Sequence, residues 1–200
     1  MNAHIDRLQH GYTSGARRAV AGIVSHATRL PVTANQVTAA GFLLNVAAAV
    51  LIFQEWWIVA GIVFIVGSIL DVFDGAIARS RGSAGPRGAF IDSVVDRVSE
   101  VVVLGAIALV LARDGETVAL AAVFAALGFS LLTSYVRAKA EALGLDGTHG
   151  MLARAERVVL VSAALILAPL GALPYLMMLL ALLSAITVAQ RARHVLKQLP

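Results

Sequence analysis

The sequence contains no cysteine, and this absence excludes several kinds of chemistry at once. A disulfide framework, a thiolate metal site and a cysteine nucleophile are all impossible without it. Charge is scarce too: 14% of the 200 residues are Asp, Glu, Lys or Arg, whereas 59% are hydrophobic and the mean hydropathy is +0.84. This balance lies outside ordinary soluble usage and predicts an integral membrane protein.

The sequence also lacks internal repeats and long low-complexity runs, and its length fits a single domain. We expect no signal peptide, because residues 1–18 contain no short apolar segment followed by a cleavage site. The net charge of +4 would suit either nucleic acid or anionic lipid. Because the basic residues stand beside hydrophobic segments, the pattern favours lipid and phosphate ligands and not nucleic acid.

Acidic residues are few, and four of them form two closely spaced pairs in apolar surroundings. Asp71 and Asp74 are three positions apart, and Asp92 and Asp96 are four positions apart. Residues with these spacings share one face of a helix, so each pair would present two carboxylates together. The link between the pairs, residues 80–87, contains Gly, Ser, Pro and Arg and predicts a turn. Two antiparallel helices would then bring the four carboxylates face to face.

Carboxylates that converge in a low-dielectric site repel one another unless they are protonated, paired with bases or bound to cations. Oxygen ligands suit hard cations such as Mg²⁺, Mn²⁺ or Ca²⁺, and two divalent ions would balance four negative charges. Two metal ions on shared carboxylates are a recurrent arrangement for displacement at phosphorus. For any single Asp, the alternatives are a paired or capping residue, or a proton-relay carboxylate of a transporter.

The pattern D-x-x-D-G-x-x-A-R, followed by G-x-x-x-D-x-x-x-D, resembles the signature of the CDP-alcohol phosphatidyltransferase family. It is filled here by Asp71, Asp74, Gly75, Ala78, Arg79, Gly88, Asp92 and Asp96. The resemblance implies that an alcohol hydroxyl attacks the β-phosphorus of CDP-diacylglycerol and that CMP leaves. It implies that two Mg²⁺ ions, with Mn²⁺ as the alternative, are bound by Asp71, Asp74, Asp92 and Asp96. Asp96 would also be the general base that takes the proton of the attacking hydroxyl.

The same resemblance implies contacts to the CDP-lipid. In the family, a T-P-N-like element before the first span contacts the nucleotide, which indicates Asn35 and Gln36 here, with Ala34 in place of the proline. The other implied contacts are Gly75, which lets the backbone approach the nucleotide, Arg79, which meets a phosphate, and Gly85 in the turn. The alternative for Gly85 is an ordinary turn glycine.

Basic residues gather in the second half of the chain, namely Arg137, Lys139, Arg154, Arg157 and Arg191. Such a cluster beside a metal site suggests an acceptor that carries phosphate, although positive-inside topology would also place basic residues there. The segments S-Y-V-R-A-K-A-E and R-A-E-R resemble the phosphatidylinositol-phosphate synthase branch of the family, whose acceptor is inositol 1-phosphate. That resemblance assigns the acceptor phosphate to Ser134, Arg137, Arg154 and Arg191. For Lys139 and Arg157, the alternative is pairing with Glu141 and Glu156.

Two other functions remain open at this point. Glycerol 3-phosphate is the alternative acceptor, since it also presents a phosphomonoester and would give phosphatidylglycerol phosphate. A cation- or proton-coupled transporter is the alternative of a different class. It predicts flux across a bilayer without CMP release, and it gives no role to Gly75, Ala78, Arg79 or Gly88. A membrane scaffold would not explain four buried acids.

Apolar runs separated by short polar links predict an all-α protein with six transmembrane helices. We expect these helices at residues 37–53, 58–78, 88–111, 117–140, 154–170 and 175–190. Residues 12–30 place apolar and basic side chains on opposite sides of a helix, which predicts an amphipathic interfacial helix before the first span. The chain would divide into an interfacial segment, 1–33, and a six-helix catalytic domain, 34–200.

Finer features are also expected. Thr33 or Asn35 should cap the first span, Trp56 and Trp57 should anchor at the membrane interface, and Arg97 should pair with Glu100. The positive-inside rule places both termini and the carboxylates on the cytoplasmic side of the cell (inner) membrane, with Arg113 on the opposite side. The family resemblance suggests a homodimer.

Overall fold

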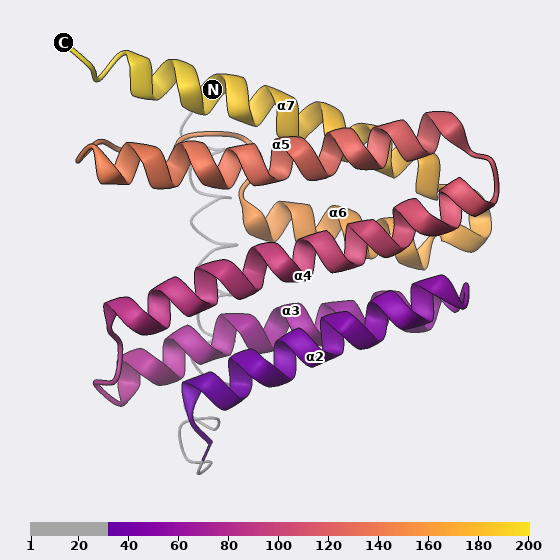
Figure 1. Ribbon diagram of the computed structural model, residues 1–200, viewed down its shortest axis with the longest axis horizontal. Coiled ribbons are helices and arrows are strands. Elements are labelled where there is room, and N and C mark those ends of the chain that lie inside the picture. Colours follow the sequence, from indigo (N-terminus) through magenta and orange to yellow (C-terminus); the bar gives the residue numbers. More distant parts are fainter. Residues whose placement is uncertain (1–31) are drawn as a thin grey trace, which may run out of the picture.

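The computed structural model describes residues 32–200, and this part of the chain consists of helices and links without a strand (Figure 1). The helices are α2 (Ala34–Phe53), α3 (Trp57–Ser80), α4 (Pro86–Arg113), α5 (Thr117–Ala142), α6 (Arg154–Ile166) and α7 (Leu173–Leu196), with a 3₁₀ turn, η1 (Ala168–Leu170), before α7. The all-α prediction is confirmed for these residues. The amphipathic helix expected over residues 12–30 lies outside the described residues.

Four of the described helices, α2, α3, α5 and α7, are long and apolar enough to cross a membrane. α4 has 28 residues, but acidic and basic side chains interrupt its first half. α6 has 13 residues and is therefore about 20 Å long, shorter than the apolar core of a bilayer. The chain is thus a membrane protein with four candidate spans in its described part.

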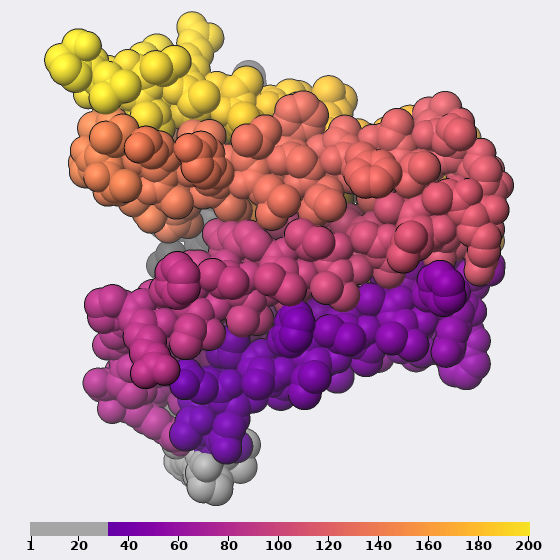
Figure 2. All heavy atoms as spheres, viewed as in Figure 1, coloured from indigo at the N-terminus to yellow at the C-terminus, as the bar shows by residue number. Residues whose placement is uncertain are grey.

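The helices lie lengthwise beside one another, and short links reverse the chain between most neighbours (Figure 1). α2 packs on α3 and α4, α5 packs on α7, and α6 lies against α3 and α7. In the space-filling view, α4 separates α2 from α5, and α7 runs along the outer side of α5 (Figure 2). The amino-terminal ends of α2, α4 and α6 therefore meet the carboxyl-terminal ends of α3, α5 and α7 at one end of the bundle.

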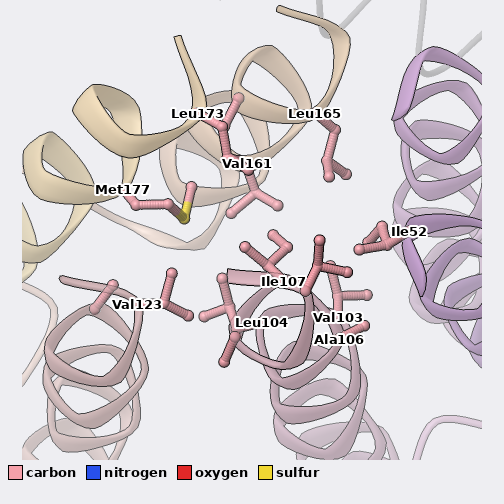
Figure 3. Close-up of a cluster of buried hydrophobic side chains, with 14 of the residues drawn as sticks. Ile52, Val103, Leu104, Ala106, Ile107, Val123, Val161, Leu165, Leu173 and Met177 are labelled. Atoms are coloured by element: carbon pink, nitrogen blue, oxygen red, sulfur yellow. The ribbon is translucent and has the colours of Figure 1, made fainter. Parts of the chain in front are cut away.

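The apolar core occupies the other end of the bundle. Its fully buried side chains include Ile52 of α2, Ile107 of α4, Leu165 of α6 and Met177 of α7, which point toward one another (Figure 3). In contrast, every residue from 81 to 91 is exposed. The corner where α3 turns into α4 is therefore open, whereas Thr133, Thr187 and Arg191 are buried elsewhere at the same end of the bundle.

α2 and α3 cross at two facing glycines, Gly41 and Gly67. A Cβ atom added to either glycine would lie 3.0 Å from the backbone carbonyl oxygen of the other. Small residues at such a crossing allow two backbones to approach closely. This contact sets the register of α2 against the half of α3 that carries Asp71 and Asp74.

Local sequence explains several helix ends. The Thr33 hydroxyl accepts a hydrogen bond from the Gln36 N–H (3.3 Å), and Gln36 Oε1 accepts one from the Thr33 N–H (2.8 Å). This capping box confirms Thr33 as the N-cap of α2. α4 begins at Pro86, whose fixed φ suits the first helical position. The helix predicted over 154–170 is divided, because α6 ends at Ile166 and Gly171, with φ 75°, closes η1.

The two tryptophans after α2 differ in their surroundings. Trp56 is 60% exposed, whereas Trp57 is half-buried and packs against the apolar core. The exposed ring of Trp56 suits the predicted interface anchor, and Trp57 matches the core alternative.

Candidate active site

Three carboxylates from two helices converge at the open end of the bundle. Asp71 and Asp74 of α3 and Asp92 of α4 each offer an oxygen atom, and these oxygens all lie within 4.8 Å of one another. The spacing of three residues places the first two on one face of α3, as the sequence predicted. One buried oxygen of Asp92, Oδ1, has no hydrogen-bond partner. Three clustered oxygen donors with an unpartnered buried oxygen fit a hard divalent cation.

Asp96 belongs to the same region but has different neighbours. Its carboxylate lies 2.6 Å from Nη2 of Arg154 and 3.2 Å from Nη1 of Arg97. Arg154, the first residue of α6, also forms an ion pair with Asp71 through Nη1. The structure therefore brings Asp96 next to the cluster through a shared guanidinium and not as a fourth member of the three-carboxylate group.

Thr38 of α2 contacts the carboxylate cluster through Asp74. It is 8% exposed, and its hydroxyl donates a hydrogen bond to Asp74. Such a donor orients a carboxylate toward a metal ion. The sequence interpretation missed Thr38, since a threonine in an apolar run carries no signal before the Gly41–Gly67 crossing is known.

A cavity of about 460 Å³ opens beside Asp74 and Asp92. Four of the residues predicted to contact the CDP-lipid line this cavity, namely Asn35, Gly75, Arg79 and Gly85. Gln36, the fifth, is not among the lining residues, and its side chain serves the capping box. Gly88 also lines the cavity, and a Cβ atom built on it would meet nothing within 4 Å. The space beside this glycine is therefore open to a ligand and is not filled by another helix.

The residues predicted to bind the acceptor phosphate lie at the same end of the bundle but have separate partners. Arg137 is exposed and pairs with Glu141 at 2.8 Å, and Ser134 is half-buried on the same helix. Arg191 is 5% exposed and donates hydrogen bonds to the carbonyl oxygens of Thr133 (2.7 Å) and His149 (3.0 Å). Arg154 is occupied by the carboxylates.

These basic groups nevertheless concentrate positive charge. Arg191 lies near Arg137 and Arg157, whose charges repel its own, and near Asp146 and Glu141, whose charges attract it. A phosphate that bound between these guanidinium groups would lower their repulsion further than Asp146 and Glu141 do.

The expected pair between Arg97 and Glu100 is wrong. Glu100 instead accepts hydrogen bonds from Arg157 Nε (3.0 Å) and from the Ser130 hydroxyl. These contacts join α4, α5 and α6, whereas Arg97 contacts Asp96 and the carbonyl oxygen of Ser93 on its own helix. Arg157, which is 5% exposed, forms its ion pair with Glu100 and not with Glu156.

The link between α5 and α6 is tied to the end of α7. The Asp146 N–H donates to Gln198 Oε1, and Gln198 Nε2 donates to the Asp146 carbonyl oxygen, both at 2.9 Å. Hydrogen bonds from Thr148 hold the pKa of the Asp146 carboxyl below its usual value. The His149 and His194 rings stack with their centroids 4.6 Å apart. The link leads directly into Arg154, so α7 helps to place that guanidinium.

The sequence model of the CDP-alcohol phosphatidyltransferase family matches residues 31–190, a range that includes the carboxylates, the cavity and every basic residue of the acceptor set except Arg191. The chain belongs to the CDP-alcohol phosphatidyltransferase family. This membership confirms the family and the class of enzyme that the sequence predicted.

Named relatives agree with this membership. The chain is 37% identical to the archaetidylinositol phosphate synthase of Pyrococcus horikoshii over 172 residues, which cover 85% of this chain and 87% of that protein. It is 34% identical to the phosphatidylinositol phosphate synthase of Cutibacterium acnes over 197 residues, which cover 92% of this chain and 95% of that protein.

Solved structures of the family share this arrangement of helices. The phosphatidylinositol phosphate synthase of Mycobacterium tuberculosis with CDP-DAG bound matches with a TM-score of 0.80 and 30% identity, over 89% of this chain and 94% of that one. The same enzyme in complex with manganese and citrate matches with a TM-score of 0.79 and 31% identity, over 88% of each chain.

Proposed function

We propose that this phosphatidyltransferase moves the phosphatidyl group of CDP-diacylglycerol to inositol 1-phosphate and releases CMP. The observation that carries the proposal is the meeting of Asp71, Asp74 and Asp92 beside a cavity that contains Arg79. The names of the relatives at 34% and 37% identity support inositol phosphate as the acceptor. Glycerol 3-phosphate is the second candidate, because its phosphomonoester would suit the same basic corner.

Asp71, Asp74 and Asp92 would hold divalent cations together with Asp96, two ions in all, Mg²⁺ or Mn²⁺. The manganese complex of the related enzyme supports this assignment. When bound, the cations would neutralise the pyrophosphate and stabilise the leaving CMP. The Thr38 hydroxyl would keep the Asp74 carboxylate turned toward them.

The cavity would hold the nucleotide end of the CDP-lipid. Arg79 would bind a phosphate, Asn35 would contact the nucleotide, and the glycines at 75 and 85 would let the ligand approach the backbone. Gln36 would act through its capping bond to Thr33. The acyl chains would extend from this end of the bundle into the bilayer.

Asp96 would act as the general base. It would accept the proton of the acceptor hydroxyl while the hydroxyl oxygen bonds to the β-phosphorus. The bond from this phosphorus to the oxygen shared with the CMP phosphate breaks, and CMP leaves with that oxygen and its electron pair. The acceptor phosphate would be held by Ser134, Arg137, Arg154 and Arg191, which orient the hydroxyl toward the reacting phosphorus.

The membrane arrangement follows from the same proposal. α4 and α6 would complete six spans with the four candidate spans, after an interfacial segment, 1–33, and within one catalytic domain, 34–200. Both termini and the carboxylates would face the cytoplasm at the cell (inner) membrane, where nucleotide-activated lipid is available. The enzyme would act as a homodimer.

The test is CMP release by the purified protein from CDP-diacylglycerol with Mg²⁺, with inositol 1-phosphate, glycerol 3-phosphate, inositol and serine offered separately. We expect release with inositol 1-phosphate and little with the two acceptors that lack phosphate. Asp92→Asn should lose this activity, and Asp114→Asn, in an exposed link at the other end of the bundle, should keep it. CMP release with glycerol 3-phosphate alone would show that the acceptor is glycerol 3-phosphate and not inositol 1-phosphate. Cation flux without CMP release would favour the transporter.

A further inference from the structure

Arg154 occupies an unusual place for a residue expected to bind a substrate phosphate. Its guanidinium spans two acidic residues from different helices, with Nη1 on Asp71 and Nη2 2.6 Å from Asp96. The side chains of Asp71 and Asp96 are 8% and 9% exposed, whereas that of Arg154 is 40% exposed. The carboxylates are therefore fixed inside the bundle, and the guanidinium reaches them from the open side.

Asp71 is shared by two groups. It is one of the three carboxylates whose oxygens converge, and it is also the partner of Arg154. A divalent ion that bridged Asp71 and Asp96 would need the oxygens that Arg154 contacts. The positive charge of the ion would also repel the guanidinium of Arg154 beside it. Arg154 and such an ion therefore compete for the carboxylate oxygens of Asp71 and Asp96.

We propose that the guanidinium of Arg154 neutralises Asp71 and Asp96 as long as no acceptor is bound. The acceptor phosphate then draws Arg154 away from these two carboxylates, so that a divalent ion can bind between them. This inference rests on the proposed function, since it uses a phosphate-bearing acceptor. A phosphomonoester is a strong partner for an arginine fork, and the 40% exposed side chain of Arg154 can meet it on the open side of the site.

The exchange couples two binding events. If a phosphate favours the state in which Arg154 has left Asp71 and Asp96, it raises the affinity of these carboxylates for the divalent ion. The divalent ion then raises the affinity of the protein for phosphate by the same factor. Without an acceptor, Arg154 and Arg97 keep Asp96 ion-paired, so this base is not free to take a proton from water. The coupling would thus protect the bound CDP-lipid from hydrolysis until an acceptor is present.

The test measures Mn²⁺ binding by electron paramagnetic resonance of the free ion, on the full chain in detergent and without CDP-lipid. Titrations run with no addition, with inositol 1-phosphate, with glycerol 3-phosphate and with inorganic phosphate, each corrected by the same solution without protein. We expect a phosphomonoester to lower the Mn²⁺ Kd by about fivefold or more, the size of an ordinary coupling. No change in the wild-type Kd with any of the three phosphates would overturn the proposal.

Variants locate the effect. Arg154→Gln should bind Mn²⁺ tightly without phosphate and should no longer respond to it, and Arg154→Lys, which cannot span both carboxylates, should lie between this variant and the wild type. Arg113→Gln, whose side chain pairs with Glu55 and Asp114 far from the site, should behave as the wild type. An unchanged or weaker Mn²⁺ affinity in a folded Arg154→Gln protein would contradict the competition.

The wild-type titrations decide the matter alone if Arg154→Gln does not fold. Failure of the proposed function is recognised separately, as absence of CMP release with every acceptor. Failure of the coupling is recognised in the Mn²⁺ titration, which requires no turnover.

Discussion

At the scale of single residues, the charge balance of the site depends on a few side chains from distant parts of the sequence. Asp74 is held by Thr38, and Asp96 is held by Arg97 and Arg154. Each partner has a different consequence, because a hydroxyl orients a carboxylate while a guanidinium also neutralises it. Substitutions here should therefore separate orientation, charge and proton transfer.

Replacing the base should remove turnover and spare binding. Asp96→Asn keeps the shape of the side chain but accepts no proton, so kcat should fall by about 10²–10⁴-fold. CDP-lipid binding, measured by titration calorimetry with Mg²⁺, should remain measurable because the cavity lies beside Asp74 and Asp92. Turnover near the parent rate would remove Asp96 as the base.

Arg154→Ala should affect the two substrates unequally. It removes a fork that we assign to the acceptor phosphate, so the KM for the acceptor should rise more than the KM for CDP-diacylglycerol. Initial rates with each substrate varied in turn would measure both. Equal rises would argue against the acceptor assignment.

Gly88→Ala should separate ligand binding from stability. Nothing in the protein lies within 4 Å of the added methyl group, so the thermal midpoint should stay the same or rise, as for Gly→Ala inside a helix. The methyl group would enter the cavity, so the KM for the CDP-lipid should increase.

Gly105→Ala is the matched control for this change. It lies on the same helix, also has open space at its Cβ position, and lies outside the cavity. It should leave the KM unchanged, and a similar KM for both variants would contradict a ligand at Gly88.

At the scale of helices, the crossing of α2 and α3 places Thr38 against Asp74. The crossing is tight on both sides, because the nearest atom to a Cβ at Gly41 or Gly67 is a backbone oxygen that cannot rotate away. The helices themselves would have to separate to admit a methyl group, and the Thr38–Asp74 hydrogen bond would weaken with them.

Gly67→Ala should therefore destabilise the protein by about 1–3 kcal/mol, the usual cost of overpacking. Thermal unfolding in detergent would measure this loss, and Mn²⁺ affinity should fall with it because Asp74 loses its orienting donor. Gly105→Ala again serves as the control. A Gly67→Ala protein as stable as the control would show that α2 and α3 do not depend on this contact.

Helices were the most predictable elements. Long apolar runs with polar links gave α2, α3, α5 and α7 close to their observed bounds, because periodicity and turn residues act locally. The division of the helix predicted over 154–170 was not foreseen, since its Pro169 and Gly171 also fit a simple helix end. The sequence left Thr33 and Asn35 open as the N-cap of α2, and the structure selects Thr33, whose spacing to Gln36 forms a capping box.

At the scale of the whole molecule, the predicted convergence of carboxylates is confirmed for Asp71, Asp74 and Asp92, since spacing and one reversal of the chain are enough to bring them together. The pairing of Arg154 with Asp71 could not be predicted, because 83 positions separate them. The same reason explains the error at Arg97 and Glu100. Two residues that share a helix face bind elsewhere when a third helix supplies a better partner.

The bundle also divides its tasks between its two ends. The apolar core packs one end, and the carboxylates and the buried arginines Arg157 and Arg191 lie at the other. Gly88→Ala should therefore weaken ligand binding and spare stability, whereas Gly67→Ala, at the crossing that places Thr38 against Asp74, should lower both stability and Mn²⁺ affinity.

The two hydrogen bonds between Gln198 and Asp146 limit where a tag can be fused to this enzyme. Gln198, two residues after the end of α7, forms two hydrogen bonds with Asp146 in the link that leads into Arg154. An affinity tag or crystallisation chaperone fused directly after Leu196 would replace Gln198 and remove both hydrogen bonds, so its effect would reach a segment some forty positions earlier in the chain. A fusion that starts beyond Pro200 through a flexible spacer should leave the kinetics of the untagged enzyme intact.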